Sequence, residues 1–269
     1  MTVIVVSGTG TEIGKTVVTA ALAATATAAG RSVAVLKPAQ TGLGFGEAGD
    51  ADEAVRLSGA TTGAELARFP EPLAPDTAAR RAGMAPVSPD EVAKAARKLA
   101  ASHDLVLVEG AGGLLVRFDD EGGTLADAAR LLGAPVLVVA PAGLGTLNST
   151  ALTAEALRAR GIEQTGVVVG SWPAGPDLAA RCNLADLPRA AGAPLLGAVP
   201  QGAGALTPGA FRAAAPSWLA PALGGSWDAA AFTASFAASY APPVPLPAPA
   251  PAPRAESRAE PAAVLSRRP

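Results

Sequence analysis

The stretch that decides the fold lies near the start of the chain and reads Val3-Ile4-Val5-Val6-Ser7-Gly8-Thr9-Gly10-Thr11-Glu12-Ile13-Gly14-Lys15-Thr16. The first four residues form an apolar run that is typical of a strand, and an alanine-rich helical pattern follows over residues 15–29. A strand, a glycine-rich loop that ends in Gly-Lys-Thr, and a helix are together the context that a phosphate-binding loop requires. We therefore predict that this segment binds the phosphates of a nucleotide.

The chemistry of the loop supports this interpretation. We expect its backbone N–H groups and the N-terminus of the following helix to point at an anion. In this geometry Lys15 can reach the β- and γ-phosphates, and the Thr16 hydroxyl can ligate Mg²⁺. Five residues separate Gly8 from Gly14, whereas four separate the two glycines of the common loop, so the motif is a variant.

The composition excludes several classes of function. The net charge is −2 and the charges are scattered, whereas a nucleic-acid-binding surface needs clustered lysine and arginine. Aromatic residues make up 4% of the chain, too few for a base-stacking platform. The N-terminus enters a strand without a signal-peptide pattern, and no apolar run approaches the ~20 residues of a membrane span. We expect a cytoplasmic protein that binds neither nucleic acid nor a membrane.

Cys182 is the only cysteine and His103 the only histidine. One cysteine forms neither an internal disulfide nor a CxxC metal site, and we interpret Cys182 as a filler residue. His103 precedes an apolar run, so we expect it at the start of a strand or at the surface. The mechanism must therefore work without histidine acid–base chemistry.

Apolar runs alternate with helical patterns along the chain. Strand-like runs cover residues 3–6, 33–36, 104–108, 136–139 and 166–169, with a further candidate over 195–199. Helical patterns cover residues 15–29, 89–101, 125–132 and 149–160. Unbroken apolar runs indicate strands that are covered on both faces, as in a parallel sheet. The prediction is a single α/β domain over residues 1–240, doubly wound around a mostly parallel sheet of the P-loop NTPase type.

The composition changes after residue 240, because proline provides nine of residues 241–269. Such a segment is too poor in apolar side chains to form a core, and we expect an extended, mobile tail without a catalytic role. A ligand for a proline-recognition domain is the alternative.

Candidate functional residues follow the predicted strands at their carboxyl ends, where ligands of doubly wound sheets bind. Beyond the glycine loop these segments are Lys37-Pro38, Glu109-Gly110-Ala111-Gly112-Gly113 and Gly143-Leu144-Gly145-Thr146-Leu147-Asn148. We expect all four loops to converge on one edge of the sheet.

Each of these residues has a structural alternative to its functional interpretation. Lys37, before a proline that is expected to end the strand, either solvates the strand end or offsets charge on transferring phosphoryl oxygens. Glu109 either ligates Mg²⁺ or is an incidental acid in a glycine-rich turn. Asp50 and Asp52 open a helical pattern, and either is a helix cap, a Mg²⁺ ligand or both.

The small residues of two loops favour close approach of a ligand. Residues 110–113 have almost no side chains, so a ligand can reach the backbone. Residues 145–148 precede a helix whose N-terminal N–H groups suit a small anion such as a carboxylate, with Asn148 and Ser149 as ordinary caps in the alternative interpretation.

Taken together, these motifs resemble those of the dethiobiotin synthetase family. The resemblance covers roughly residues 1–240, and the motif order, the spacing and the five-residue gap in the loop all match. The matching segments are residues 8–16, Lys37-Pro38-Ala39-Gln40-Thr41-Gly42, residues 108–113 and residues 144–148.

The resemblance implies roles for individual residues. The nucleotide-binding set is Gly8, Thr9, Gly10, Thr11, Glu12, Ile13, Gly14, Lys15, Thr16, Val17, Gly170 and Pro200. Lys37, Lys15 and Thr11 resemble the catalytic groups, and Thr16, Asp50 and Glu109 the Mg²⁺ ligands, with Asp50 preferred to Asp52. The substrate-binding set is Thr41, Glu109, Gly110, Ala111, Gly112, Gly113, Gly145, Thr146, Leu147 and Asn148, of which the last four receive the substrate carboxylate across a homodimer.

The resemblance also implies an ATP-dependent cyclo-ligase reaction. One amine of 7,8-diaminopelargonate takes up CO₂ as a carbamate, the carbamate attacks the γ-phosphate of ATP, and the second amine closes the ureido ring of dethiobiotin. Many relatives place an asparagine after the fifth strand to read adenine, where this chain has Val169-Gly170-Ser171-Trp172-Pro173. We therefore expect loose discrimination among nucleoside triphosphates.

Three other classes of protein share parts of the pattern. Partitioning ATPases usually carry a further lysine near the start of the loop, which is absent from Gly8-Thr9-Gly10. GTPase switches need an Asn-Lys-x-Asp motif, which the chain lacks. Cobyrinate-type amidoligases add a glutamine-hydrolysing domain with a reactive cysteine, and Cys182 has no suitable surroundings.

Overall fold

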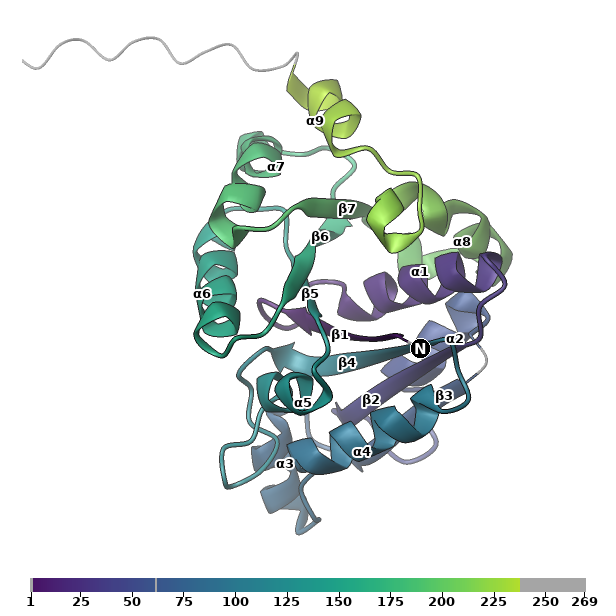
Figure 1. Cartoon of the computed structure of the whole chain (residues 1–269), viewed down its shortest axis with the longest axis vertical. Helices are drawn as coiled ribbons and strands as arrows, with labels where there is room; N and C mark the ends of the chain where they lie inside the picture. Colours follow the sequence, from purple (N-terminus) through teal and green to yellow (C-terminus); the bar gives the residue numbers. More distant parts are fainter. Residues whose placement is uncertain (1, 61, 238–269) are drawn as a thin grey trace, which may run out of the picture. The chain divides into compact units, whose positions relative to one another are not determined.

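The computed structural model describes residues 2–60 and 62–237, so the tail expected over residues 241–269 lies outside the described residues. Within them, parallel strands form one seven-stranded sheet in the order β3-β2-β4-β1-β5-β6-β7 (Figure 1). The strands are β1 (Thr2–Gly8), β2 (Val33–Thr41), β3 (Thr62–Phe69), β4 (Leu105–Gly113), β5 (Val136–Ala140), β6 (Gln164–Trp172) and β7 (Leu195–Pro200). The predicted α/β class with a parallel sheet is confirmed.

Helices cover both faces of this sheet. They are α1 (Lys15–Ala28), α2 (Asp50–Ser58), α3 (Pro75–Ala82), α4 (Pro89–Ala100), α5 (Leu125–Leu132), α6 (Thr146–Ala159), α7 (Leu178–Ala191), α8 (Pro208–Ala214) and α9 (Ala229–Ala237). Short 3₁₀ turns lie at Ala203–Ala205, Ala215–Trp218 and Pro221–Leu223. Helix α1 packs beside α2 and α8 on one face, and α4 packs beside α5 on the other (Figure 1).

The apolar runs form strands because both of their faces are covered. Every residue of β5 is buried, and Val5 and Val6 of β1 are fully inaccessible. Such strands have no solvent face that would require alternating polar residues. The helix that follows β1 is rich in alanine, and its buried residues 20–24 allow close packing on the sheet.

Local signals in the sequence set the ends of several helices. The Ser88 hydroxyl accepts the N–H of Glu91 at 3.3 Å, and the Glu91 carboxylate accepts the N–H of Ser88 at 2.8 Å. This reciprocal capping box, with Pro89 in the first turn, begins α4 at the expected residue. Glycines in the left-handed conformation end α2, α3, α5 and α7.

The expectation that Pro38 ends the second strand is wrong. β2 continues to Thr41 because the proline sits where it interrupts no pairing. Pairing with β4 ends at Leu36, and the pairs with β3 include Lys37 and Ala39 but not Pro38. The longer strand carries Lys37, Gln40 and Thr41 on one rigid element.

Five of these strands and α-helices were not predicted, namely β3, α3, α7, α8 and α9. β3 is an edge strand with Glu65 and Arg68 among its residues, so it lacks the continuous apolar run of the central strands. α7 contains Pro188, a residue that usually indicates the end of a helix, so its sequence does not predict a continuous helix. Within residues 2–60 and 62–237, no helix combines the length and apolarity that crossing a membrane requires.

Candidate active site

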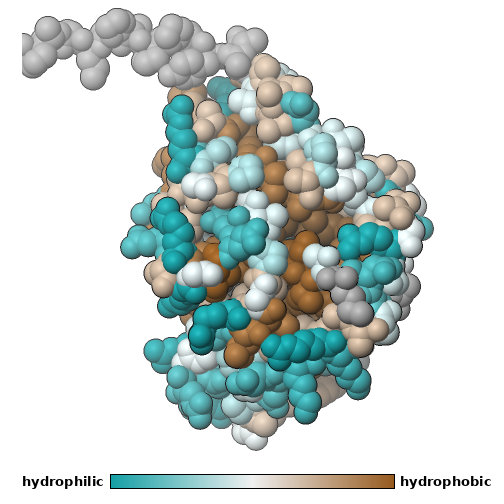
Figure 2. Space-filling view, viewed as in Figure 1, coloured by the Kyte–Doolittle hydropathy of each residue, from teal (hydrophilic) through white to brown (hydrophobic). Residues whose placement is uncertain are grey.

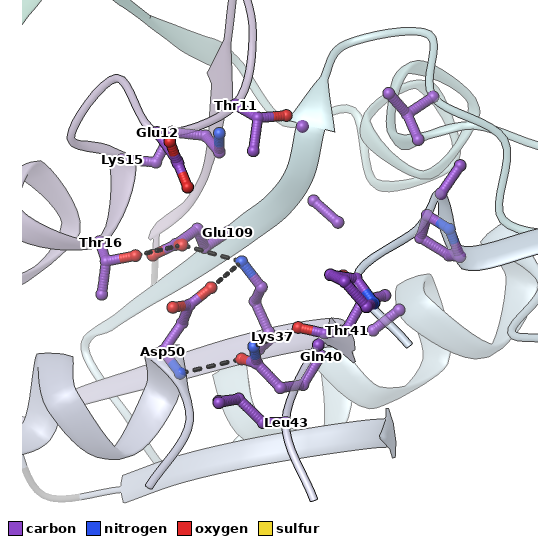
Figure 3. Close-up of a pocket in the computed structure, with 18 of the residues that line it drawn as sticks. Thr11, Glu12, Lys15, Thr16, Lys37, Gln40, Thr41, Leu43, Asp50 and Glu109 are labelled. Carbon is purple, nitrogen blue, oxygen red and sulfur yellow. Dashed lines mark hydrogen bonds and ion pairs between the residues drawn. The ribbon is translucent and has the colours of Figure 1, made fainter. Parts of the chain in front are cut away.

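A cleft of about 840 Å³ opens at the carboxyl ends of β1, β2 and β4 (Figure 3). Its charged and hydroxyl side chains come from four separate segments, namely the glycine loop with the start of α1, the end of β2, the start of α2 and the end of β4. The lining residues are Thr11, Glu12, Ile13, Gly14, Lys15, Thr16, Val17, Lys37, Ala39, Gln40, Thr41, Gly42, Leu43, Asp50, Pro72, Leu73, Ala74, Pro75, Glu109, Ala111, Gly112 and Val116. The glycine loop, the end of β2 and the end of β4 therefore converge as expected.

The glycine loop is shaped for an anion at the start of α1. Gly14 adopts the left-handed conformation at φ 92° and precedes the first residue of the helix. Glu12, at φ 57°, is the one non-glycine residue with positive φ among residues 2–60 and 62–237. Lys15 donates from its Nζ to the Gly10 carbonyl at 2.8 Å, so its ammonium is folded over the loop. Backbone amides, helix terminus and ammonium all favour phosphate.

Gly170 supports this loop through its backbone. A Cβ at Gly170 would lie 2.0 Å from the Ile13 carbonyl oxygen, and a Cβ at Gly14 would lie 2.3 Å from the Gly170 oxygen. Gly170 lies inside β6, where the sequence interpretation placed it after the strand. The geometry makes it a packing surface for the glycine loop.

A Gly170→Ala substitution is expected to displace the loop, because the added methyl has no space against Ile13 and Val139. We expect the KM for the nucleotide to rise by about tenfold, since a small misplacement of binding groups is costly. Steady-state kinetics test this, with Gly175→Ala as the matched control because a Cβ there meets open space. An unchanged KM in Gly170→Ala would contradict the packing role.

Lys37 lies at the centre of a buried ionic network. Its Nζ is 2.5 Å from Asp50 Oδ2 and 2.9 Å from Glu109 Oε1, and it donates to the Gly110 carbonyl at 3.2 Å (Figure 3). Burial lowers the pKa of Lys37, but the carboxylates of Glu109 and Asp50 outweigh that effect and raise the pKa above its ordinary value. Lys37 is therefore a permanent cation in the cleft.

Lys15 has the opposite electrostatic balance. Burial and the nearby charge of Lys37 lower its pKa to about 8, although Glu109 and Asp50 act in the other direction. The cleft thus holds two ammonium groups, of which one is fully compensated by carboxylates and one is not. The uncompensated group is the one that an incoming anion would stabilise.

Nucleotide binding is expected to take up protons above about pH 8. The free protein has Lys15 with a pKa of about 8, and a bound triphosphate raises that pKa because it adds negative charge beside the ammonium. Affinity therefore falls as the pH rises through about 8. Calorimetry at pH 8.5 in buffers of different ionisation enthalpy measures the uptake.

Lys15→Arg provides the control for this measurement, because a guanidinium stays charged throughout the range. We expect the arginine variant to bind without the uptake. Equal proton uptake by the variant and the native protein would contradict the assignment to Lys15.

Glu109 and Thr16 form a site that fits a divalent cation. Thr16 Oγ1 donates to Glu109 Oε1 at 2.9 Å. Glu109 Oε2 is buried and has no hydrogen-bond partner among the described residues, which is costly unless a further group binds there. Hydroxyl and carboxylate oxygens are the donors that Mg²⁺ prefers. Among residues 2–60 and 62–237, no group of three His, Cys, Asp or Glu side chains could hold a metal by itself.

The two aspartates of α2 have different positions. Asp50 lines the cleft and pairs with Lys37, whereas Asp52 is largely exposed and accepts the N–H of Gly49 at 2.9 Å. Asp52 is thus the residue that caps the helix. This arrangement favours Asp50 over Asp52 as the group that faces a ligand.

The segment at residues 145–148 lies at the same edge of the sheet, after β5, but does not line the cleft. Helix α6 begins at Thr146, three residues earlier than predicted, and its N-cap is Gly145 without a side-chain hydrogen bond. Asn148 and Ser149 therefore lie inside the helix and the alternative that they are caps is wrong. Asn183 of α7 donates to the Ala142 carbonyl at 2.8 Å and holds the preceding loop.

Several other predicted residues also lie outside the cleft lining. They are Gly8, Thr9, Gly10, Gly110, Gly113, Gly170 and Pro200. Of these, Gly110 contributes its carbonyl to Lys37 and Gly10 its carbonyl to Lys15. His103 lies before β4 and its ring contacts Thr62 and the Leu99 carbonyl, so it has structural partners.

One wall of the cleft was not predicted from the sequence. Its apolar side chains come from the loop between β3 and α3, from the first residue of α3 and from two other segments, namely Leu43, Pro72, Leu73, Ala74, Pro75 and Val116. No motif marks these residues, because their role depends on an edge strand that was not predicted. Gln40 was quoted within a motif but was assigned no role.

Solved structures with the same architecture show the fold alone. The ParA family ATPase from Chlorobium tepidum matches with a TM-score of 0.52 over 82% of this chain and 95% of its own, at 15% identity. Chloroplast FtsY from Physcomitrella patens matches with a TM-score of 0.50 over 87% of this chain and 65% of its own, at 17% identity. The fold and the glycine loop together define a P-loop nucleotide-binding protein.

Sequence relatives narrow this class. A family model described as an AAA domain matches residues 2–205. The ATP-dependent dethiobiotin synthetase BioD of Streptomyces coelicolor is 72% identical over 86% of this chain and 98% of its own length. The synthetase of Streptomyces avermitilis is 73% identical over 87% of this chain and 98% of its own length. That of Saccharopolyspora erythraea is 69% identical over 84% of this chain and 99% of its own length. The chain belongs to the dethiobiotin synthetase family.

Proposed function

We propose that this protein is an ATP-dependent cyclo-ligase that forms the ureido ring of dethiobiotin from 7,8-diaminopelargonate and CO₂, a step of biotin biosynthesis. The observation that carries the proposal is the buried Lys37 cation, which Glu109 and Asp50 hold beside the phosphate-binding loop in one cleft. A phosphate-binding loop alone serves many functions. The Lys37 ammonium, fixed beside this loop in addition to Lys15, suits a reaction in which two anions, the carbamate and the γ-phosphate, must approach each other.

The reaction proceeds by charge neutralisation and positioning. One amine of the substrate takes up CO₂ as a carbamate, whose oxygen attacks the γ-phosphorus of ATP and displaces ADP. The second amine attacks the carbamoyl carbon of the resulting mixed anhydride, closes the ring and expels phosphate. The loop amides and Lys15 bind the β- and γ-phosphates, and Lys37 offsets the charge of the carbamate and the transferring phosphoryl group.

Mg²⁺ is part of this proposal. Thr16, Asp50 and Glu109 are the residues that would hold it, and the buried free oxygen of Glu109 supports the assignment. When bound, the metal neutralises charge on the β- and γ-phosphate oxygens. Thr11 and Thr41 line the same cleft and contribute hydroxyl groups toward the reacting anions.

The apolar wall of the cleft suits the aliphatic chain of the diamine. Pro72, Leu73 and Pro75 are part of this wall, and they line the same cleft as Lys37. Among the described residues, Lys15 and Lys37 are the cations that line the cleft, and both are committed to the phosphate and carbamate. The carboxylate at the far end of the chain therefore needs another partner.

We infer that a second copy of the chain supplies that partner at the N-terminus of α6. Leu144 just before α6, Leu152 within α6 and Leu178 at the start of the neighbouring α7 are 93%, 59% and 56% exposed, which suits an interface between subunits. In a homodimer, residues 145–148 of one protomer meet the substrate of the other. Analytical ultracentrifugation at assay concentrations tests this, and a monomer would contradict it.

The assay that tests the proposed function measures phosphate release. We expect release only when ATP, bicarbonate and 7,8-diaminopelargonate are all present, together with stoichiometric dethiobiotin. Release without the diamine indicates a simple ATPase, and release that depends on glutamine indicates an amidoligase. Either outcome would overturn the proposal. Because ATP and bicarbonate are cytoplasmic metabolites, we place the reaction in the cytoplasm.

Base selectivity is expected to be low. Gly170 offers no side-chain amide to read adenine, and its backbone packs against the glycine loop. We expect kcat/KM values for ATP, CTP and GTP that agree within about tenfold, since one missing hydrogen bond to the base is worth about that much. Competition kinetics with the three nucleotides measure this, and an exclusive preference for ATP would contradict it.

A further inference from the structure

The N-terminus of α2 is held by a side chain from a neighbouring strand. The helix begins at Asp50, and its N-cap residue is Gly49, which has no side chain to accept a backbone N–H. Gln40 of β2 replaces that missing acceptor, because its Oε1 accepts the N–H of Asp50 at 2.9 Å (Figure 3). Gln40 is 5% exposed, so the amide oxygen has no alternative partner in bulk water.

The space around this contact is filled by the edge strand. A Cβ at Gly49 would lie 2.1 Å from Glu65 Oε1 and 3.1 Å from Gln40 Oε1. Arg68 forms a two-point ion pair with Glu65, with both N–O distances at 2.9 Å. In the sheet register, Lys37 is opposite Glu65 and Gln40 is opposite Arg68. The Glu65–Arg68 pair on β3 is therefore next to Lys37 and Gln40, the two β2 residues that contact Asp50.

Arg68 also fixes the loop that leads into α2. Its Nη1 donates to the Gly44 carbonyl at 3.1 Å and to the Glu47 carbonyl at 2.5 Å. The loop from residue 42 to residue 49 is thus attached to the sheet on both sides of its turn. The start of α2 has little freedom to move as long as these bonds persist.

We propose that Gln40 is a positioning residue that sets the Asp50 carboxylate on Lys37. The backbone N–H of Asp50 donates to Gln40, while the Asp50 carboxylate lies 2.5 Å from Lys37 Nζ. Gln40 therefore holds in place the residue that pairs with Lys37. Gln40 acts on the reaction through Asp50 and Lys37, with Arg68 and Glu65 as its support. The kinetic part of this inference rests on the proposed function.

The test compares two replacements of Gln40. Gln40→Met keeps the length of the side chain but removes the acceptor, and we expect kcat to fall about tenfold, as for other groups that orient a ligand through a neighbour. Gln40→Glu keeps an acceptor and is expected to stay within threefold of the native kcat. Gln164→Met, the same replacement at the first residue of β6, is the matched control.

A double-mutant cycle separates positioning from a general structural role. If Gln40 acts through Asp50, Gln40→Met lowers kcat in the native background but adds nothing in an Asp50→Asn background. Independent, multiplicative losses in the double variant would overturn the proposal. So would a native kcat in Gln40→Met.

A readout without turnover keeps this test distinct from the test of the proposed function. The ¹⁵N resonance of the Lys37 ammonium in the full-length, nucleotide-free protein reports its ion pairs. We expect this resonance to shift in Gln40→Met and to stay unchanged in Gln164→Met. An unchanged resonance in Gln40→Met would overturn the positioning role, even if the native protein forms dethiobiotin. If the native protein forms no dethiobiotin, the proposed function is overturned, and the resonance still tests the role of Gln40.

Discussion

Replacement of Lys15 by alanine is expected to lower kcat/KM for ATP by about 1,000-fold, because a single cation on the transferring phosphoryl group contributes at least that much in related reactions. The side chain lies over the glycine loop, and its pKa of about 8 shows that the cleft of the free protein does not compensate its charge. The missing compensation is what the triphosphate supplies.

The same substitution is not expected to destabilise the fold. Burial already disfavours the charged form of Lys15, so its removal relieves a cost and leaves no buried anion without a partner. Steady-state kinetics and thermal unfolding together measure both effects, with Lys94→Ala on the exposed side of α4 as the control. A kcat/KM for ATP within threefold of native would contradict the role of Lys15.

Replacement of Lys37 by methionine is expected to affect both activity and stability. We expect kcat to fall by about 1,000-fold, because the fixed cation next to the reacting anions is lost. The free energy of unfolding is expected to fall by about 3 kcal/mol, because Glu109, which is 1% exposed, is left as a buried anion without its cation. Denaturant unfolding and ring-formation kinetics measure the two effects.

A second replacement distinguishes the two roles of Lys37. The double variant Lys37→Met, Glu109→Gln removes the buried anion as well, so we expect it to recover most of the lost stability and none of the lost activity. Equal stability of the single and double variants would show that Glu109 is not an uncompensated charge. Recovery of activity would show that Lys37 only balances Glu109.

The parts of this protein that depend on local sequence could be predicted. The central strands are continuous apolar runs, and a strand that is buried on both faces has no other pattern. The glycine loop has a motif whose geometry is set by Gly14 and by the helix after it. The convergence of Lys15, Lys37 and Glu109 then follows from parallel strands, because their carboxyl ends share one edge.

The parts that depend on pairing between distant segments could not be predicted. Pro38 is compatible with β2 only because the partners on both sides leave it unpaired, which no property of the proline itself indicates. The role of Gln40 depends on the position of α2, and the apolar wall at Pro72 depends on the edge strand β3. The choice between Asp50 and Asp52 likewise required the direction of each side chain.

The central claim is that a carbamate oxygen and the γ-phosphorus of ATP meet beside Lys37 in this cleft. The most direct test supplies ¹⁸O-labelled bicarbonate and measures the isotope in the released phosphate by mass spectrometry. Attack by the carbamate leaves one of its oxygens on phosphorus when the ring closes, so we predict one ¹⁸O atom in each phosphate at early times. Unlabelled phosphate from labelled bicarbonate, with dethiobiotin still formed, would contradict the account.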